Sequence, residues 1–178
     1  LKSKGYDGTN PWCDYANAGI KDGQIASGWL LDNTDLPANI QEVDSETPWL
    51  TGEAIEFIDQ ATGPWCAHLS YIKPHWPYIV PDPYASMYGP EHVPPANRAS
   101  YERADAHPVF ESFMNGPVGR AFQDEEVRQK VIPAYMGLIK QCDDQLGRLL
   151  DHLEKTNRLR DTMIVLTSDH GDYLGDHW

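Results

Sequence analysis

Apolar residues recur at two different spacings along the 178-residue chain, and these spacings predict an alternation of helices and strands. Over residues 48–61 one helical face carries the apolar residues, namely Leu50, Ala54, Phe57, Ile58 and Ala61. Thr47 can cap this helix, Pro48 suits its first position, and Gly63-Pro64 ends it. The apolar run WCAHLSYI, residues 65–72, follows between prolines and is predicted to be a strand.

A longer helical pattern lies nearer the carboxyl end. It runs from about Asp124 to Leu153, with a predicted buried face at Val127, Val131, Ala134, Tyr135, Leu138, Cys142, Leu146, Leu149, Leu150 and Leu153. Pro133 should kink or divide this helix, and Asn157 suits a left-handed stop. The apolar segment DTMIVLTSD then predicts a second strand, over residues 162–168, covered on both faces. This order of elements predicts an α/β fold with a mostly parallel sheet.

Two segments interrupt this alternation. Residues 1–47 are rich in Gly, Asn, Asp and Pro, and they predict an irregular surface segment anchored by Trp12, Tyr15, Trp29 and Leu30. Residues 73–117 begin with KPHWPYIVPDPYASMYGPEHVPP, which has seven prolines in 23 residues. Proline removes a backbone donor and fixes φ, so this segment is predicted to be an ordered excursion with one short helix over 107–114.

Composition narrows the classes of function. Acidic residues outnumber basic ones 27 to 14, which gives a net charge of -13 and no basic face for nucleic acid. An anionic substrate would be repelled unless a cation or a few aimed side chains received it. No stretch approaches the roughly 18 apolar residues of a membrane span. Cys13, Cys66 and Cys142 are far apart, which predicts reduced thiols and a cytoplasmic location rather than disulfides or a zinc ribbon.

The strongest candidate chemistry follows the second predicted strand, in TSDHGDYLGDHW, residues 167–178. Asp169 and His170 would lie at the carboxyl end of that strand, where α/β sheets bind their ligands. A carboxylate and an imidazole suit Mn, Zn or Fe, and Gly171 lets the backbone turn so that both can face one ion. The alternative is a solvated polar turn, which the Asp-His pair alone would favour; the longer pattern favours a metal site.

Several segments resemble the sulfatase branch of the alkaline phosphatase superfamily, and its phosphonate monoester hydrolase and phosphodiesterase members above all. TSDHGDYLGDHW resembles the second metal-binding motif of that family, and KPHWPYIVPDPY resembles its central substrate-side segment. The segments NPWCDYAN, DSETPWLT, HLSYIKPHWPY and AYMGLIKQCDDQLGRLLDHL extend the resemblance over most of the chain. It implies a partial alkaline-phosphatase-like sandwich in which residues 1–178 are an internal fragment of one catalytic domain, with the Pro-rich excursion at 73–117.

The resemblance also implies roles for individual residues. Asp169 and His170 would bind a divalent metal (Mn, Zn or Ca), and His75 would hold a non-bridging ester oxygen or assist the leaving group. Lys73 stays open between a functional and a bracing role, and His68, within a predicted strand, is taken as structural. Support of the loop, rather than metal binding, is expected of Asp172, Asp176 and His177.

The family's nucleophile has no counterpart in these residues. It is a cysteine in Cys-x-Pro-x-Arg or Cys-x-Ala-x-Arg that is converted to formylglycine, and Cys13, Cys66 and Cys142 do not fit that pattern. The expectation is a parent protein that hydrolyses small anionic sulfate, phosphate or phosphonate esters, with the fragment alone inactive. His170 in place of an asparagine favours phosphorus esters, and uncovered strand edges predict a homo-oligomer.

Two other interpretations remain open. One is another enzyme of the same superfamily, of the mutase or nucleotide pyrophosphatase type, with a Ser or Thr nucleophile. The other is a non-catalytic folding or assembly module whose acidic turn binds nothing.

Overall fold

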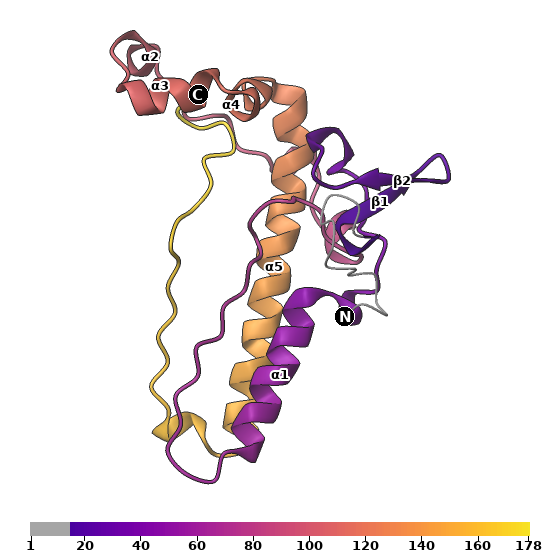
Figure 1. The fold of residues 1–178 in the computed structure, drawn as a ribbon, viewed down its shortest axis with the longest axis vertical. Coiled ribbons are helices and arrows are strands. Elements are labelled where there is room, and N and C mark those ends of the chain that lie inside the picture. The colour runs from indigo at the N-terminus through magenta and orange to yellow at the C-terminus, as the bar shows by residue number, and fades with distance from the viewer. Residues whose placement is uncertain (1–14) are drawn as a thin grey trace.

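The computed structural model describes residues 15–178. The long helix α5, Glu125–Lys155, extends along most of the long axis of the molecule (Figure 1). Asp124 caps α5 by accepting a hydrogen bond from the backbone N–H of Glu126. The predicted helix is confirmed, but Pro133 does not divide it, because Pro133 lies in a buried turn whose packing offsets one lost hydrogen bond. Asn157 takes the expected left-handed conformation after the helix, at φ 58°.

Among residues 15–178, no helix combines the length and apolarity needed to cross a membrane.

Helix α1, Glu46–Gln60, packs beside the lower half of α5 and runs in the same direction (Figure 1). The predicted helix over 48–61 is confirmed, although it begins two residues earlier, with Ser45 rather than Thr47 at the N-cap position. The two helices are joined by polar as well as apolar contacts, since Gln141 of α5 donates from Nε2 to the Ser45 hydroxyl at 2.8 Å. Thr51 and Ile58 are buried in the same interface.

A β-hairpin lies beside the upper half of α5, on the same side as α1 (Figure 1), and within the segment predicted to be irregular. Strands β1, Ala18–Lys21, and β2, Gln24–Ser27, pair antiparallel, and Asp22 and Gly23 make the turn with φ 51° and 77°. Asp-Gly between alternating apolar residues is a strong hairpin signal, so this element was predictable. Of the expected anchors, Trp29 is half-buried but Leu30 is 57% exposed, so the prediction that Leu30 anchors this segment was wrong. Trp12 and the Tyr15 side chain lie outside the described residues.

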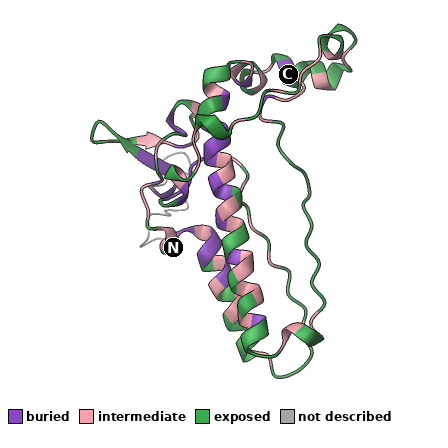
Figure 2. Ribbon diagram, turned by 180° about the vertical axis from the view of Figure 1, so that it is seen from behind, coloured by how far each residue is buried: buried purple, intermediate pink, exposed green. Residues whose placement is uncertain are grey.

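The two predicted strands are extended but unpaired. Residues 65–72 and 162–168 follow the ends of α1 and α5 and run back in one direction, without strand assignment (Figures 1 and 2). The only sheet among residues 15–178 is β1–β2, so the predicted mostly parallel sheet was wrong for this part of the chain. A strand needs a neighbour for its backbone N–H and C=O groups, and no described segment supplies one.

The two extended segments differ in how they are covered. In the first, every second side chain near its end is partly covered, so that Leu69 and Tyr71 are half-buried while Ile72 is 58% exposed. The Tyr71 hydroxyl lies 2.6 Å from that of Thr51 on α1. In the second, apolar side chains point into solvent, and Met163 and Leu166 are 88% and 78% exposed (Figure 2). The exposed apolar surface expected beside missing strands is therefore present.

The Pro-rich excursion is ordered by short helices. These are α2, Tyr101–Ala104, and α3, Pro108–Asn115, and helix α4, Pro117–Phe122, follows them at the amino end of α5. The helix predicted over 107–114 is confirmed as α3, which His107 caps by accepting from the N–H of Val109.

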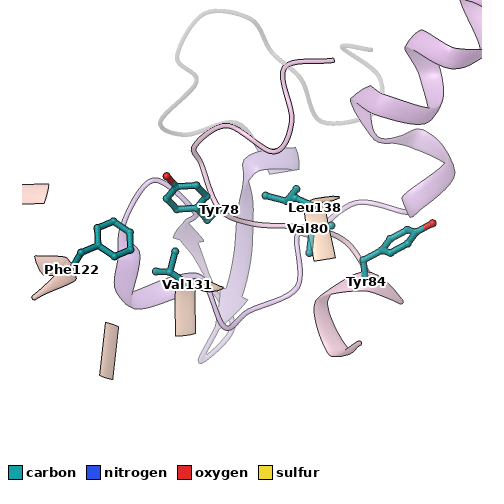
Figure 3. Close-up of a cluster of buried hydrophobic side chains, with 6 residues drawn as sticks. All are labelled: Tyr78, Val80, Tyr84, Phe122, Val131 and Leu138. Carbon is teal, nitrogen blue, oxygen red and sulfur yellow. The ribbon is translucent and has the colours of Figure 1, made fainter. Parts of the chain in front are cut away.

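The core lies where the first part of the excursion crosses α5. Its buried members are Tyr78, Val80, Tyr84, Phe122, Val131 and Leu138 (Figure 3). Gly137 permits the crossing, because a Cβ there would lie 2.6 Å from the backbone oxygen of Tyr84. The predicted face of α5 is fully buried at Val131, Ala134, Leu138 and Leu153 and half-buried at its other positions. This core fixes the segment that immediately follows His75.

Candidate active site

The loop that carries His75 is tied at both ends. The N–H of His75 donates to the Ile72 carbonyl at 3.1 Å, which turns the chain at the end of the extended segment. Lys73 donates from Nζ to the Pro77 carbonyl at 2.7 Å and closes the loop from the other side. The thiol of Cys142, on α5, contacts the Lys73 carbonyl at 3.4 Å. The His75 loop is therefore braced against the long helix.

Neighbouring side chains of this loop point to opposite sides. Trp76 turns inward, where its indole N–H donates to the Trp29 carbonyl at 3.2 Å and its ring stacks on Tyr78 at 5.9 Å. His75 is exposed, and its Nδ1 lies 2.8 Å from the Trp76 carbonyl. If this Nδ1 carries the proton, Nε2 keeps a lone pair that can act as an acceptor or base.

Asp169 and His170 form a tight local pair. Asp169 Oδ1 accepts the backbone N–H of His170 at 2.9 Å, and His170 Nδ1 lies 3.0 Å from the Gly171 carbonyl. The Gly171 carbonyl contact and the charge of Asp169 raise the pKa of His170. Both side chains are open to solvent, with 89% of Asp169 and 58% of His170 exposed.

The pair meets the basic requirements of a metal site. A histidine ligand usually donates its second ring N–H to a carbonyl or carboxylate, as His170 Nδ1 can to Gly171. The free Nε2 then lies 3.8 Å from Asp169 Oδ2. Bonds from each atom to one cation are roughly 2.0–2.2 Å, so both atoms can reach the same ion. Among residues 15–178, no three potential ligands converge, so this part of the chain offers two ligands of a set.

The two motifs meet in space. The His75 and His170 rings lie 6.1 Å apart between centroids, at 69° to each other. Tyr78 also lies near Asp172: burial raises the pKa of Tyr78, and so does the neighbouring Asp172 carboxylate. The predicted approach of His75 to the Asp169–His170 pair is confirmed, while their roles as ligands and ester contact remain predictions.

The structure also defines the contacts and exposure of the other residues that the sequence analysis considered. Lys73 braces the His75 loop with its ammonium turned inward, and burial lowers its pKa to about 8. His68 is exposed on the extended segment rather than packed within a strand. Asp176 accepts the Asn97 N–H at 2.9 Å, and His177 Nδ1 lies 2.6 Å from Glu102 Oε1, so both support the loop's downstream end.

The sequence analysis missed Arg128, whose side chain is only 1% exposed. It donates to the Leu174 carbonyl, four residues beyond His170. The available signal was its position between Val127 and Val131, on the apolar side of the predicted helix.

Comparison with known families accounts for these features together. The Sulfatase family model matches residues 3–178. The chain belongs to the sulfatase family. This confirms the resemblance of the two motifs, and both the His75 loop and the Asp169–His170 pair lie within the matched region.

Two sequence relatives agree with the match to the sulfatase family. The multifunctional alkaline phosphatase superfamily protein PehA of Trinickia caryophylli is 36% identical over 157 residues, covering 81% of this chain and 30% of its own. An arylsulfatase of Clostridium perfringens is 28% identical over 143 residues, covering 79% of this chain and 29% of its own.

A solved sulfatase-family structure matches nearly all of the chain. Phosphonate monoester hydrolase SpPMH from Silicibacter pomeroyi has a TM-score of 0.76 and 30% identity, over 99% of this chain and 35% of its own. The separated extended segments thus belong to an arrangement found in an alkaline-phosphatase-like enzyme. The chain spans about a third or less of the length of these relatives.

Proposed function

We propose that the protein hydrolyses phosphonate, phosphate or sulfate esters at a metal-dependent site to which this chain contributes Asp169, His170 and His75. The observation that carries the proposal is the 6.1 Å approach of the His75 and His170 rings from motifs far apart in the sequence. Membership of the sulfatase family supports the same chemistry.

Each side chain has a role that its surroundings permit. Asp169 and His170 would hold a divalent cation (Mn, Zn or Ca), which when bound polarises an ester oxygen. His75 would contact a non-bridging oxygen or protonate the leaving group, since its ring is exposed and its loop is braced by Lys73. With a net charge of -13 on the chain, such local contacts would be needed to receive an anion.

The nucleophile is proposed to come from outside residues 1–178. Cys66 is followed by AHLS and Cys142 by DDQL, neither of which fits the formylglycine pattern. Cys142 is also half-buried against Lys73, and burial raises the pKa of its thiol to about 11, which disfavours the thiolate. A formylglycine elsewhere in the protein would supply the attacking hydroxyl, and the group it displaces from the ester could take a proton from His75.

Phosphorus esters are the first substrates to test. The names of PehA and SpPMH point to phosphatase and phosphonate chemistry in those proteins, and the sequence puts His170 directly after Asp169. An arylsulfatase among the relatives keeps sulfate esters in the assay. Aryl phosphonate, phosphate diester and aryl sulfate should therefore be compared with Mn²⁺, Zn²⁺ and Ca²⁺.

The experiment separates the metal ligands from the ester contact. In the full-length protein, Asp169→Ala should remove bound metal and abolish turnover, because the site loses a negatively charged ligand. His75→Ala should keep metal content and lower turnover roughly 10²–10⁴-fold, the range of one acid–base group. His68→Ala, at an exposed position on the preceding segment, is the matched control. Full activity of Asp169→Ala would overturn the site, and absence of tight metal binding would favour a non-catalytic module.

A further inference from the structure

Arg128 is a charged side chain buried near the amino end of α5, with 1% of its side chain exposed. A buried guanidinium is costly unless its donors are used. Here Nη1 donates to both carboxylate oxygens of Glu125, Nη2 donates to the Pro94 carbonyl at 3.1 Å, and Nε donates to the Leu174 carbonyl at 3.2 Å. One side chain therefore joins the helix, the middle of the Pro-rich excursion and the turn after Asp169–His170.

A second arginine, Arg98, hydrogen-bonds to the same turn. Arg98 donates from Nε to the Gly175 carbonyl and from Nη2 to the Phe122 carbonyl. Gly175 has φ +94°, and a Cβ there would lie 2.7 Å from the Phe122 oxygen and 2.8 Å from both arginine side chains. The turn thus fits against the two guanidinium groups only with glycine at its centre. Arg98, Arg128 and residues 174–176 are called the latch below.

Further contacts extend the latch toward the end of the described chain. The N–H of Asn97 donates to Asp176 Oδ1, and the N–H of His177 donates to the Asn97 carbonyl, at 2.9 and 2.8 Å. Asp176 Oδ1 also lies 3.8 Å from Arg128 Nη2. Leu174 packs against the buried core cluster. The downstream side of the Asp169–His170 loop is therefore fixed at several points.

The upstream side is different. Residues 163–168 are exposed, and no backbone hydrogen bond joins them to another described segment. Between the two sides, the loop is contacted at three places: the His75 ring approaches His170, Tyr78 lies near Asp172, and the Phe110 ring approaches Tyr173. The latch is accordingly the main attachment of this loop to the folded part of the chain.

We propose that Arg128 and Arg98 are positioning residues for the metal-ligand pair, acting through the latch rather than by touching metal or substrate. This inference rests on the proposed function of Asp169 and His170. Without the latch, the two ligands keep their chemistry but lose their fixed spacing relative to His75. The cation must then order a mobile loop as it binds, which lowers affinity while leaving the ligand set intact.

The test is the affinity of the full-length protein for Mn²⁺ alone, measured by titration calorimetry below the melting temperature of every variant. Arg128→Met and Arg128→Lys should bind Mn²⁺ roughly 10–100-fold more weakly, the usual effect of losing a group that supports a metal ligand. Lysine keeps the charge but lacks the fork that holds several carbonyls at once. Arg120→Met is the matched control, since Arg120 is exposed on neighbouring α4.

A second variant leaves both arginines in place. Gly175→Ala should displace the turn and weaken Mn²⁺ binding to a similar degree, and it decides the question if Arg128→Met does not fold. Turnover of the folded latch variants should recover at saturating Mn²⁺, which loss of a ligand or a general structural defect would not allow.

The outcomes distinguish the two proposals. Wild-type Mn²⁺ affinity in folded Arg128→Lys and Gly175→Ala, together with loss of binding in Asp169→Ala, would overturn the latch and leave the site. Unchanged binding in Asp169→Ala would instead overturn the proposed function. Weaker binding in Arg120→Met as well would show that the effect is not specific to the latch, and would count against it.

Discussion

Replacing Lys73 with methionine should change how stability depends on pH. The Lys73 ammonium is turned inward, where it donates to the Pro77 carbonyl and lies near Glu46 and Cys142. Burial lowers the pKa of Lys73 from 10.5 to about 8, and the negative charge of Glu46 opposes that change. Methionine has nearly the same length and no charge, so the variant removes the titration while keeping most of the packing.

The size and sign follow from the two pKa values. The unfolded chain keeps the Lys73 proton up to about pH 10.5, whereas the folded protein keeps it only to about pH 8. The penalty for burying the charge is therefore fully present below pH 8 and disappears as the pH rises from 8 to 10.5. The difference between these pKa values corresponds to about 3 kcal/mol. Wild type should gain about that much stability relative to Lys73→Met across this window.

One neighbour titrates in the opposite direction. Burial raises the pKa of Cys142 to about 11, against the effect of Lys73, so its contribution to stability falls as the pH rises from about 9 to 11. The comparison should therefore be made in a Cys142→Ala background, by urea unfolding at intervals from about pH 7 to 10.5. Lys130→Met, at an exposed position on α5, controls for the loss of a lysine as such. Parallel stability curves for the protein that keeps Lys73 and for the Lys73→Met variant would refute the buried-ammonium reasoning.

Three smaller predictions concern packing around α5. Gly137→Ala should destabilise the protein by about 1–3 kcal/mol in urea unfolding, because its Cβ would press on the backbone oxygen of Tyr84. Gly147→Ala, on the same helix with nothing within 4 Å of its Cβ, should instead stabilise by roughly 0.5–1 kcal/mol, and equal effects at the two glycines would contradict the close approach. Tyr84→Phe removes a 2.9 Å hydrogen bond to Asp144 and should cost about 1 kcal/mol; no loss would mean that water replaces the contact.

Much of the helical structure could be predicted because its signals are local. The face marked by Val131, Leu138 and Leu153 needs only a helical period of roughly 3.6 residues, and Asp124 is a strong cap. The approach of His75 to His170 was also predictable, because both follow extended segments that run in one direction. These inferences depend on few contacts distant in sequence.

The remaining features depend on partners that sequence patterns do not name. The apolar run at 163–166 has the composition of a strand, but pairing is a property of its neighbours, which no described segment provides. The place of Arg128 depends on carbonyl groups of Pro94 and Leu174, which any residue carries. The Asp22-Gly23 turn, in contrast, was a purely local signal that the sequence analysis overlooked.

The exposed extended segment also bears on solubility. The run TMIVLT is uncharged, rich in β-branched and other apolar residues, and free of proline, which is the composition of an aggregation-prone window. Charged residues flank it on both sides: Arg160 and Asp161 precede it, and Asp169 follows it closely. Such flanking charges oppose self-association of newly made chains before the segment is covered. Asp169 would then limit aggregation during synthesis in addition to its chemical role. A poor soluble yield of Asp169→Ala would reflect aggregation of newly made chains rather than a damaged fold.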